Sequence, residues 1–201
     1  TYTYTNENGC TNSATTVITV NPVPIVSAGT YGPVCADAAD ITLIGSPIGG
    51  TFTGVGVTGN LFDPSVGTQT ITYTYTNGSG CTNSATTVIT VNSLPVVSGT
   101  ALNVLCNGGA TGSIDLSVSG GSGPYSYLWS NGAVTEDISG LSAGTYHVTV
   151  TNATGCTAAA SFTITEPPVL GVSVNSIIHI SCAGTSTGSV TVIASGGVLF
   201  A

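Results

Sequence analysis

Residues 72–92 read TYTYTNGSGCTNSATTVITVN, and residues 1–21 read TYTYTNENGCTNSATTVITVN. The two stretches differ at only two positions and recur with a period of 71 residues. In each, a run that alternates Thr with Tyr is followed by a Gly-containing turn and a second strand-like run, which is the pattern of a β-hairpin. Because solenoid units usually span about 20–50 residues, the longer period predicts small β-sandwich modules.

A second repeat type follows the first. Residues 102–121 (LNVLCNGGATGSIDLSVSGG) align with residues 178–197 (IHISCAGTSTGSVTVIASGG) at an offset of 76, which places Cys106 over Cys182. Two repeat types in 201 residues predict several small modules rather than one large domain. We expect the sequence to be part of a longer array of such modules.

Alternation of apolar and polar residues predicts strands throughout, and we see no helical pattern. Trp129, the only Trp, lies within an expected strand and is predicted to anchor the core of its module. The alternation with Thr predicts that Tyr2, Tyr4, Tyr73 and Tyr75 face a core. The expected strands are Val23–Ser27, Ile41–Ile44, Thr51–Thr53, Asn60–Asp63, Thr68–Thr76, Cys81–Val91, Leu102–Cys106, Ser113–Ser119, Tyr125–Trp129, Val134–Ile138, Thr145–Thr151 and Thr157–Thr165.

Charge is nearly absent from the chain. It has no Lys or Arg and eight acidic residues, and 41% of its residues are hydrophobic. That hydrophobic fraction favours a folded protein over a disordered one. Without a basic residue the chain cannot neutralise phosphates, so nucleic-acid binding is not expected. No run approaches the roughly 20 apolar residues of a membrane span, so direct membrane insertion is not expected either.

The six cysteines fall into two classes by their place in the repeat. One class lies early in its repeat, and the other lies late, directly after an Asn-containing turn. With no Cys-x-x-Cys pair and only two His, the sequence does not indicate zinc. It favours disulfides, which imply an oxidising compartment and stabilise by about 4 kcal/mol for loops of this size. Pairing early with late inside each repeat predicts Cys35–Cys81 and Cys106–Cys156, and leaves Cys10 and Cys182 to pair outside this sequence.

Residues 121–156, GSGPYSYLWSNGAVTEDISGLSAGTYHVTVTNATGC, resemble the SprB-type repeat, as does the Cys106-Asn107-Gly108-Gly109 segment before them. The resemblance covers roughly residues 102–168, with a partial copy from 178, and residues 1–92 resemble Ig-like or PKD-like repeats. It implies an all-β fold of tandem antiparallel β-sandwich modules in an elongated array. The expected modules are the C-terminal hairpin of an Ig-like repeat at 1–21, an Ig-like repeat at 22–92, a SprB-type β-sandwich repeat at 93–168, and the start of a further SprB-type repeat at 169–201.

SprB-type repeats occur in giant gliding-motility adhesins and related surface proteins of Bacteroidota. The resemblance therefore implies export by a type IX secretion system and an extracellular location on the bacterial cell surface. We expect a structural stalk or filament segment that projects a distal binding region for attachment, gliding or contact with other cells. The alternative is that the repeats themselves bind polysaccharide or a partner cell surface. Adjacent repeats of the same chain are the expected partners, and lateral homo-oligomers and surface polysaccharide are left open.

The sequence does not indicate an enzyme. His147 and His179 each alternate with apolar neighbours and are predicted to point outward. A Ser-His-Asp triad lacks an accompanying nucleophile-elbow sequence. Paired glycosidase carboxylates would have to come from eight acids, of which Glu136 and Asp137 are adjacent and expected to face opposite ways.

No cofactor is expected, although calcium is left open because acidic β-sandwich arrays use carboxylates and carbonyls to bind it. The weak calcium candidates are Asp37 and Asp40, which flank an expected loop near Cys35. The uncharged strands motivate one more hypothesis. Natural sheets usually guard their edges with charge, Pro or bulges, so bare Thr-rich strands favour lateral assembly into a filament.

Overall fold

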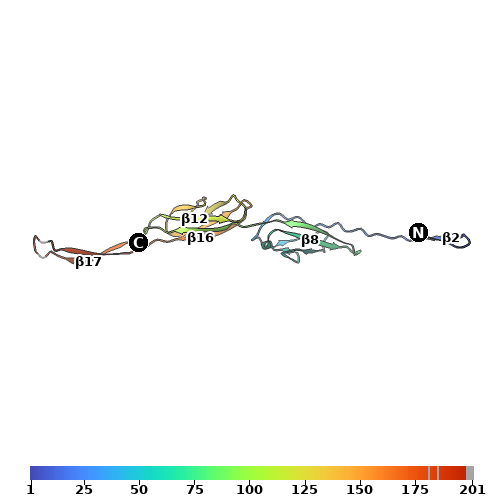
Figure 1. Ribbon diagram of the computed structural model, residues 1–201, viewed down its shortest axis with the longest axis horizontal. Coiled ribbons are helices and arrows are strands. Elements are labelled where there is room, and N and C mark those ends of the chain that lie inside the picture. The colour runs from blue at the N-terminus through green and yellow to red at the C-terminus, as the bar shows by residue number, and fades with distance from the viewer. Residues whose placement is uncertain (181, 185, 198–201) are drawn as a thin grey trace. The chain divides into compact units, whose positions relative to one another are not determined.

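The computed structural model describes residues 1–180, 182–184 and 186–197 (Figure 1). Over these residues the chain forms β-strands and one short 3-10 helix, η1 (Pro64–Val66), without an α-helix. This confirms the predicted all-β fold. The contacts divide the chain into two compact units: residues 1–34 with 38–91, and residues 35–37 with 92–201.

The first unit contains two small antiparallel sheets that share one core. One sheet has the order β5 (Thr51–Thr53), β8 (Gln69–Thr76), β9 (Thr82–Ile89), and the other has the order β4 (Ile41–Thr42), β7 (Leu61–Phe62), β6 (Val57–Thr58). Strands of both sheets contribute buried side chains, which makes the unit a β-sandwich. The core residues are Ala28, Leu43, Phe52, Phe62, Ile71, Tyr73 and Ile89.

Strand β8 shows how the sequence pattern forms this sandwich. Ile71 and Tyr73 are buried, whereas the intervening Thr residues face the opposite side of the strand. On that side Thr72 and Thr76 of β8 lie across from Thr86 and Thr82 of β9, and the hydroxyls of Thr76 and Thr82 are 2.8 Å apart. The hairpin therefore buries one face and places a row of hydroxyls on the other.

The second unit repeats the two-sheet plan. One sheet has the order β11 (Val96–Leu102), β12 (Gly112–Ser119), β14 (Ile138–Leu141), and the other has the order β13 (Ser126–Trp129), β15 (Gly144–Thr151), β16 (Thr157–Ile164). Trp129 is 2% exposed at its core, and its indole N–H donates to the Thr135 carbonyl at 2.9 Å. This confirms the predicted core anchor. The core residues are Val104, Ile114, Leu116, Trp129, Ile138, Leu141, Val148, Val150 and Ile164.

Two further hairpins and one short strand pair complete the fold. The hairpins are β1 (Tyr2–Thr5) with β2 (Thr11–Ala14), and β17 (Gly171–Ile178) with β18 (Ser189–Ser195). The short pair is β3 (Val34–Cys35) with β10 (Val91–Asn92).

The prediction that all four tyrosines face a core is wrong for two of them. Tyr2 is 72% exposed and Tyr4 is 60% exposed, although their hairpin is nearly identical in sequence to β8–β9. Tyr73 is buried and Tyr75 is half-buried. The burial of a tyrosine in this pattern thus depends on a second sheet. Alternation places the tyrosines on one face of the hairpin, but it does not determine whether another sheet packs against that face.

Most expected strands of the two sandwiches are confirmed, and three are displaced or absent. Of the expected strand 102–106, only Leu102 lies in a strand, as the last residue of β11, and residues 103–106 follow it. Val104 is nevertheless buried, and its N–H donates to the Thr165 carbonyl. Residues 134–137 likewise precede β14. Residues 23–27 form only a single bridge, Ser27 to Ser46, because proline at position 24 supplies no backbone donor.

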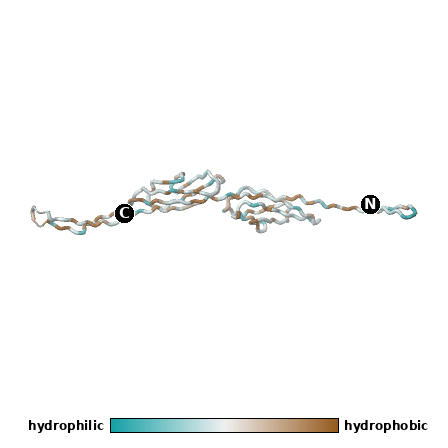
Figure 2. The backbone as a smooth tube through the Cα atoms, in the orientation of Figure 1, coloured by the Kyte–Doolittle hydropathy of each residue, from teal (hydrophilic) through white to brown (hydrophobic). Residues whose placement is uncertain are grey.

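Hydrophobic and hydrophilic residues are interleaved along the backbone (Figure 2). In the described part of the chain, no helix has the length and apolar character that would let it cross a membrane.

Candidate functional site

The structure contains a disulfide between Cys35 and Cys156, whose Cα atoms are 5.6 Å apart and whose sequence separation is 121 residues. The predicted pairs Cys35–Cys81 and Cys106–Cys156 are therefore wrong. Cys35 belongs to the predicted repeat at 22–92 and Cys156 to the predicted repeat at 93–168, although both cysteines lie in the second compact unit. The bond joins cysteines of two successive repeats instead of closing a loop inside each one.

Strand geometry explains why the predicted pairs do not form. Cys81 directly precedes β9, whereas Cys35 lies in β3, which pairs with β10 after the other end of β9. Ten extended residues span about 33 Å, and a disulfide needs Cα atoms within about 7 Å. Early and late cysteines of one repeat thus lie at opposite ends of its final strand. The same holds for Cys106 and Cys156, which lie at opposite ends of β16, because Asn107 donates its side-chain N–H to the Pro167 carbonyl at 3.1 Å.

The disulfide is assembled around Asn92, the last residue of β10. The Asn92 carbonyl accepts the N–H of Ala36 at 3.0 Å, directly after Cys35. The Sγ atom of Cys156 lies 4.0 Å from the same carbonyl oxygen. The Asn92 carbonyl thus lies next to both cysteines of the disulfide. We call this arrangement the Asn92 joint.

A buried asparagine holds the turn that carries Cys156. Asn152 is 5% exposed, and its Oδ1 atom accepts the backbone N–H groups of Thr154 at 3.1 Å and of Cys156 at 2.9 Å. Its Nδ2 donates to the Ser93 carbonyl at 3.0 Å. This side chain orders the turn and attaches it to the chain next to Asn92.

The sequence predicts this asparagine only as part of a turn, and its role in the joint was not predicted. The signal was present, because Asn precedes each late cysteine by four residues in three places. The structure shows the same bond at each: the Cys N–H donates to the Asn Oδ1 at 2.8 Å for Cys10 and Asn6, and at 3.0 Å for Cys81 and Asn77.

The other cysteines lie elsewhere. Cys10 and Cys106 are exposed free thiols, Cys81 is a half-buried free thiol, and Cys182 is exposed. Pairing of Cys10 and Cys182 outside this sequence stays a prediction.

The predicted calcium ligands Asp37 and Asp40 are both exposed. Within the described residues, no three His, Cys, Asp or Glu side chains are grouped as a metal site would need. Calcium at these two residues stays a prediction.

Two other acids have structural roles. Asp63 caps the 3-10 helix η1 by accepting the Ser65 N–H at 2.8 Å, and hydrogen bonds from Ser65 lower the pKa of that carboxyl group. Asp137 accepts the N–H of Leu116 at 2.9 Å.

Both histidines are exposed, which confirms their outward orientation. The Nδ1 atom of His147 lies 2.8 Å from the Ser161 hydroxyl, across the β15–β16 pair. This contact is a cross-strand pair on an open sheet face. It provides no cavity in which a substrate would be enclosed.

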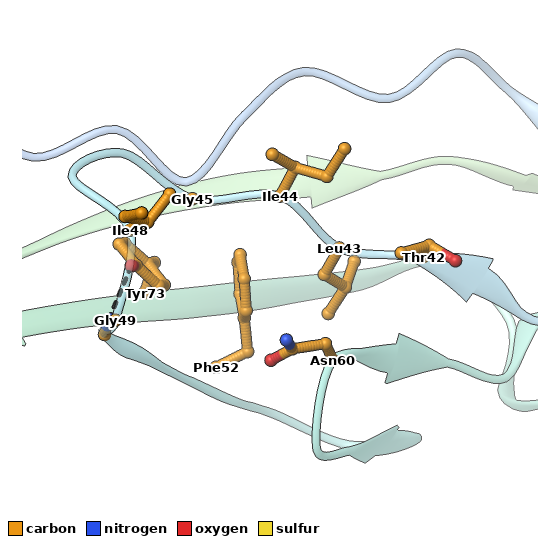
Figure 3. A pocket seen from close by; sticks show the side chains of 10 residues that line it. Thr42, Leu43, Ile44, Gly45, Ile48, Gly49, Phe52, Asn60 and Tyr73 are labelled. Atoms are coloured by element: carbon orange, nitrogen blue, oxygen red, sulfur yellow. Dashed lines mark hydrogen bonds between the residues drawn. The ribbon is translucent and has the colours of Figure 1, made fainter.

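A hollow of about 320 Å³ lies in the first unit. Figure 3 shows Leu43, Phe52 and Tyr73 pointing into its interior. These three side chains belong to the core. The Tyr73 hydroxyl accepts the Gly50 N–H at 2.7 Å and donates to the Pro47 carbonyl. The aromatic rings are thus committed to packing and are not presented for stacking on a sugar.

The chain thus contains two β-sandwich units and a disulfide between cysteines of two successive predicted repeats. The family model of the SprB repeat matches residues 98–134 and 176–200. The chain therefore carries SprB-type repeats, a repeat type of surface adhesin-like proteins rather than of enzymes. Residues 1–92 lie outside the match, so their Ig-like or PKD-like character stays a prediction. A search of curated proteins returned no match.

Proposed function

We propose that this chain is a load-bearing stalk segment of a large adhesin on the bacterial cell surface, exported by a type IX system. The observation that carries the proposal is the disulfide between cysteines of successive repeats. The SprB-type repeats support the surface location. In this role the repeats hold a distal binding region away from the cell for attachment, gliding or contact with other cells.

The covalent path explains how such a segment resists tension. Force applied along the chain passes from Cys35 through the disulfide to Cys156. The residues between them carry no end-to-end load while the bond is intact. These residues include all strands of the first sandwich and, except for β16, all strands of the second. The sandwiches are thereby protected from full extension even when their hydrogen bonds break.

A single-molecule pulling experiment tests this proposal. The chain is held at its two ends and stretched until both sandwiches unfold. Cys35→Ser removes the disulfide, and the unfolded length should then increase by about 400 Å, because 121 residues extend at about 3.3–3.6 Å each. Cys106→Ser is the matched control and should leave the unfolded length unchanged.

Two outcomes would count against the stalk. An unfolded length that is equal with and without Cys35 would show that the bond bears no load. Saturable binding of the intact chain to a glycan array would favour the alternative function, in which the repeats themselves bind polysaccharide.

A further inference from the structure

The Asn92 joint has equivalents at both other repeat boundaries. Asn21 and Asn92 occupy the same place in the two 21-residue copies. Pro167 is the third equivalent: the Thr90 carbonyl accepts the N–H of Val34, and the Thr165 carbonyl accepts the N–H of Val104, both at 3.1 Å. The Thr residue that accepts this hydrogen bond lies two residues before Asn92 in one case and two residues before Pro167 in the other. We call these three residues the exit residues.

A complete joint has an early side and a late side. At Asn92, the early side is the Ala36 N–H on the exit carbonyl, next to Cys35. The late side is the Cys156 sulfur 4.0 Å from that carbonyl, with Asn152 donating to the carbonyl of the following residue, Ser93, at 3.0 Å.

At Asn21 the late side alone is present. The Cys81 thiol lies 3.7 Å from the Asn21 carbonyl oxygen, and Asn77 donates to the carbonyl of the following residue, Pro22, at 3.2 Å. Both contacts match those of Cys156 and Asn152. The thiol is therefore held where Cys156 is held, with its Asn turn attached in the same way.

At Pro167 the early side alone is present. Asn107, directly after Cys106, donates its side-chain N–H to the Pro167 carbonyl at 3.1 Å, where Ala36 uses its backbone N–H at Asn92. The Gly108 N–H donates to the Glu166 carboxylate at 2.8 Å. A groove of about 400 Å³ borders this position, lined by Ala101–Leu105 and Thr165–Pro167. At Asn92 the Asn152–Cys156 turn lies against the exit residue and Ser93, through the Asn152 hydrogen bond to the Ser93 carbonyl and the Cys156 sulfur near the Asn92 carbonyl.

We propose that Cys81 and Cys106 are each one half of an inter-repeat disulfide of the Cys35–Cys156 kind. Cys81 pairs with the early cysteine of a preceding repeat, and Cys106 pairs with the late cysteine of a following repeat, whose Asn turn fills the groove beside Pro167. In each reaction two thiols lose two protons and two electrons and form one S–S bond. The acceptor is a disulfide, which is reduced to two thiols.

The consequence is a chain of overlapping covalent loops. The loop from Cys35 to Cys156 would overlap the loop that ends at Cys81 and the loop that begins at Cys106. Every repeat would then be linked covalently to the next one along the array. This cross-linking is a property of the covalent structure and does not depend on the stalk function.

The test inserts a second copy of residues 22–92 into the full chain, after Pro167. Cys81 of the original copy, Cys35 of the inserted copy, Cys10 and Cys182 are changed to Ser, so that four cysteines remain. The reduced protein is refolded with oxidised and reduced glutathione, and free thiols are then alkylated. Chymotryptic peptides are mapped by mass spectrometry without reduction, because trypsin has no site in this sequence.

We expect two linked peptide pairs, Cys35–Cys156 and Cys106 with Cys81 of the inserted copy. Cys106→Ser in the same chain is the control: Cys81 should then be alkylated while Cys35–Cys156 still forms. Asn77→Ala in the inserted copy should slow formation of the new bond and leave Cys35–Cys156 unaffected.

The Cys35–Cys156 pair reports that the chain has folded. If it forms while Cys106 and Cys81 are both alkylated, the proposal is wrong. A Cys106–Cys156 link would overturn it as well, and would also contradict the disulfide in the structure. In either case the pulling experiment on the original chain remains a separate test of the stalk.

Discussion

Asn152 is the residue on which the joint depends most. It is almost completely buried, and it satisfies the N–H groups of Thr154 and Cys156 while donating to Ser93. The Asn152 side chain therefore stabilises the turn, because backbone N–H groups are costly to leave without a hydrogen-bond acceptor.

Asn152→Ala should lower the free energy of unfolding of the second unit by about 1–3 kcal/mol, since it leaves the N–H group of the buried Cys156 without its acceptor. Asn131→Ala is the matched control, because Asn131 is exposed and its side chain accepts the N–H of Ala133. Asn131→Ala should lower the free energy of unfolding by less than half as much as Asn152→Ala. Urea titration followed by Trp129 fluorescence measures both variants, and equal losses would contradict the role given to Asn152.

Cys156→Ser removes the disulfide and should reduce the free energy of unfolding of the same unit by about 2–5 kcal/mol. Cys106→Ser makes the same substitution at an exposed free thiol. It should alter the free energy of unfolding by less than about 0.5 kcal/mol. Thermal denaturation without reductant compares the two. If Cys156→Ser is as mild as Cys106→Ser, the bond does not stabilise the fold.

At the scale of elements, strand β8 depends on the position of Tyr73. A Cβ atom at Gly45 or Gly50 would lie within about 2.5 Å of the Tyr73 ring, so both glycines are needed for the loop to enclose it. The Tyr73 hydroxyl then accepts the Gly50 N–H and donates to Pro47. The ring and its hydroxyl fix the loop that connects β4 with β5.

Tyr73→Phe keeps the ring and removes the hydroxyl, which leaves Gly50 and Pro47 without this partner. The expected loss in the free energy of unfolding of the first unit is about 1–3 kcal/mol. Tyr75→Phe, two residues along the same strand and only half-buried, should be nearly neutral. Denaturant unfolding followed by circular dichroism measures both, and the reverse ranking would contradict this description of the core.

The elements were largely predictable because their signals are local. Alternation along 68–76 and 145–151 sets strands β8 and β15, and Trp129 is buried as expected. The pairing of cysteines was not predictable in this way. Repeat phase shows which cysteines are equivalent, but it does not show that early and late cysteines of one repeat lie a full strand length apart. That fact emerges only when β3 is seen to pair with β10.

At the scale of the whole molecule, the scarcity of charge bears on association between chains. Strand β9 is the last strand of its sheet and carries no charged residue. An uncharged edge favours pairing with another strand. We predict that the chain associates laterally as its concentration rises, and that Thr86→Lys on this strand weakens the association. Light scattering measures both, and a monomer at every concentration would contradict lateral assembly.

The covalent link between successive repeats depends on which cysteines are bonded. A non-reducing peptide map of the oxidised chain, with free thiols alkylated before chymotryptic digestion, determines this directly. The structure predicts a linked pair of peptides that contain Cys35 and Cys156, with Cys81 and Cys106 alkylated. A map with Cys35 linked to Cys81 and Cys106 linked to Cys156 would contradict it, because each repeat would then be closed on itself and no bond would join successive repeats.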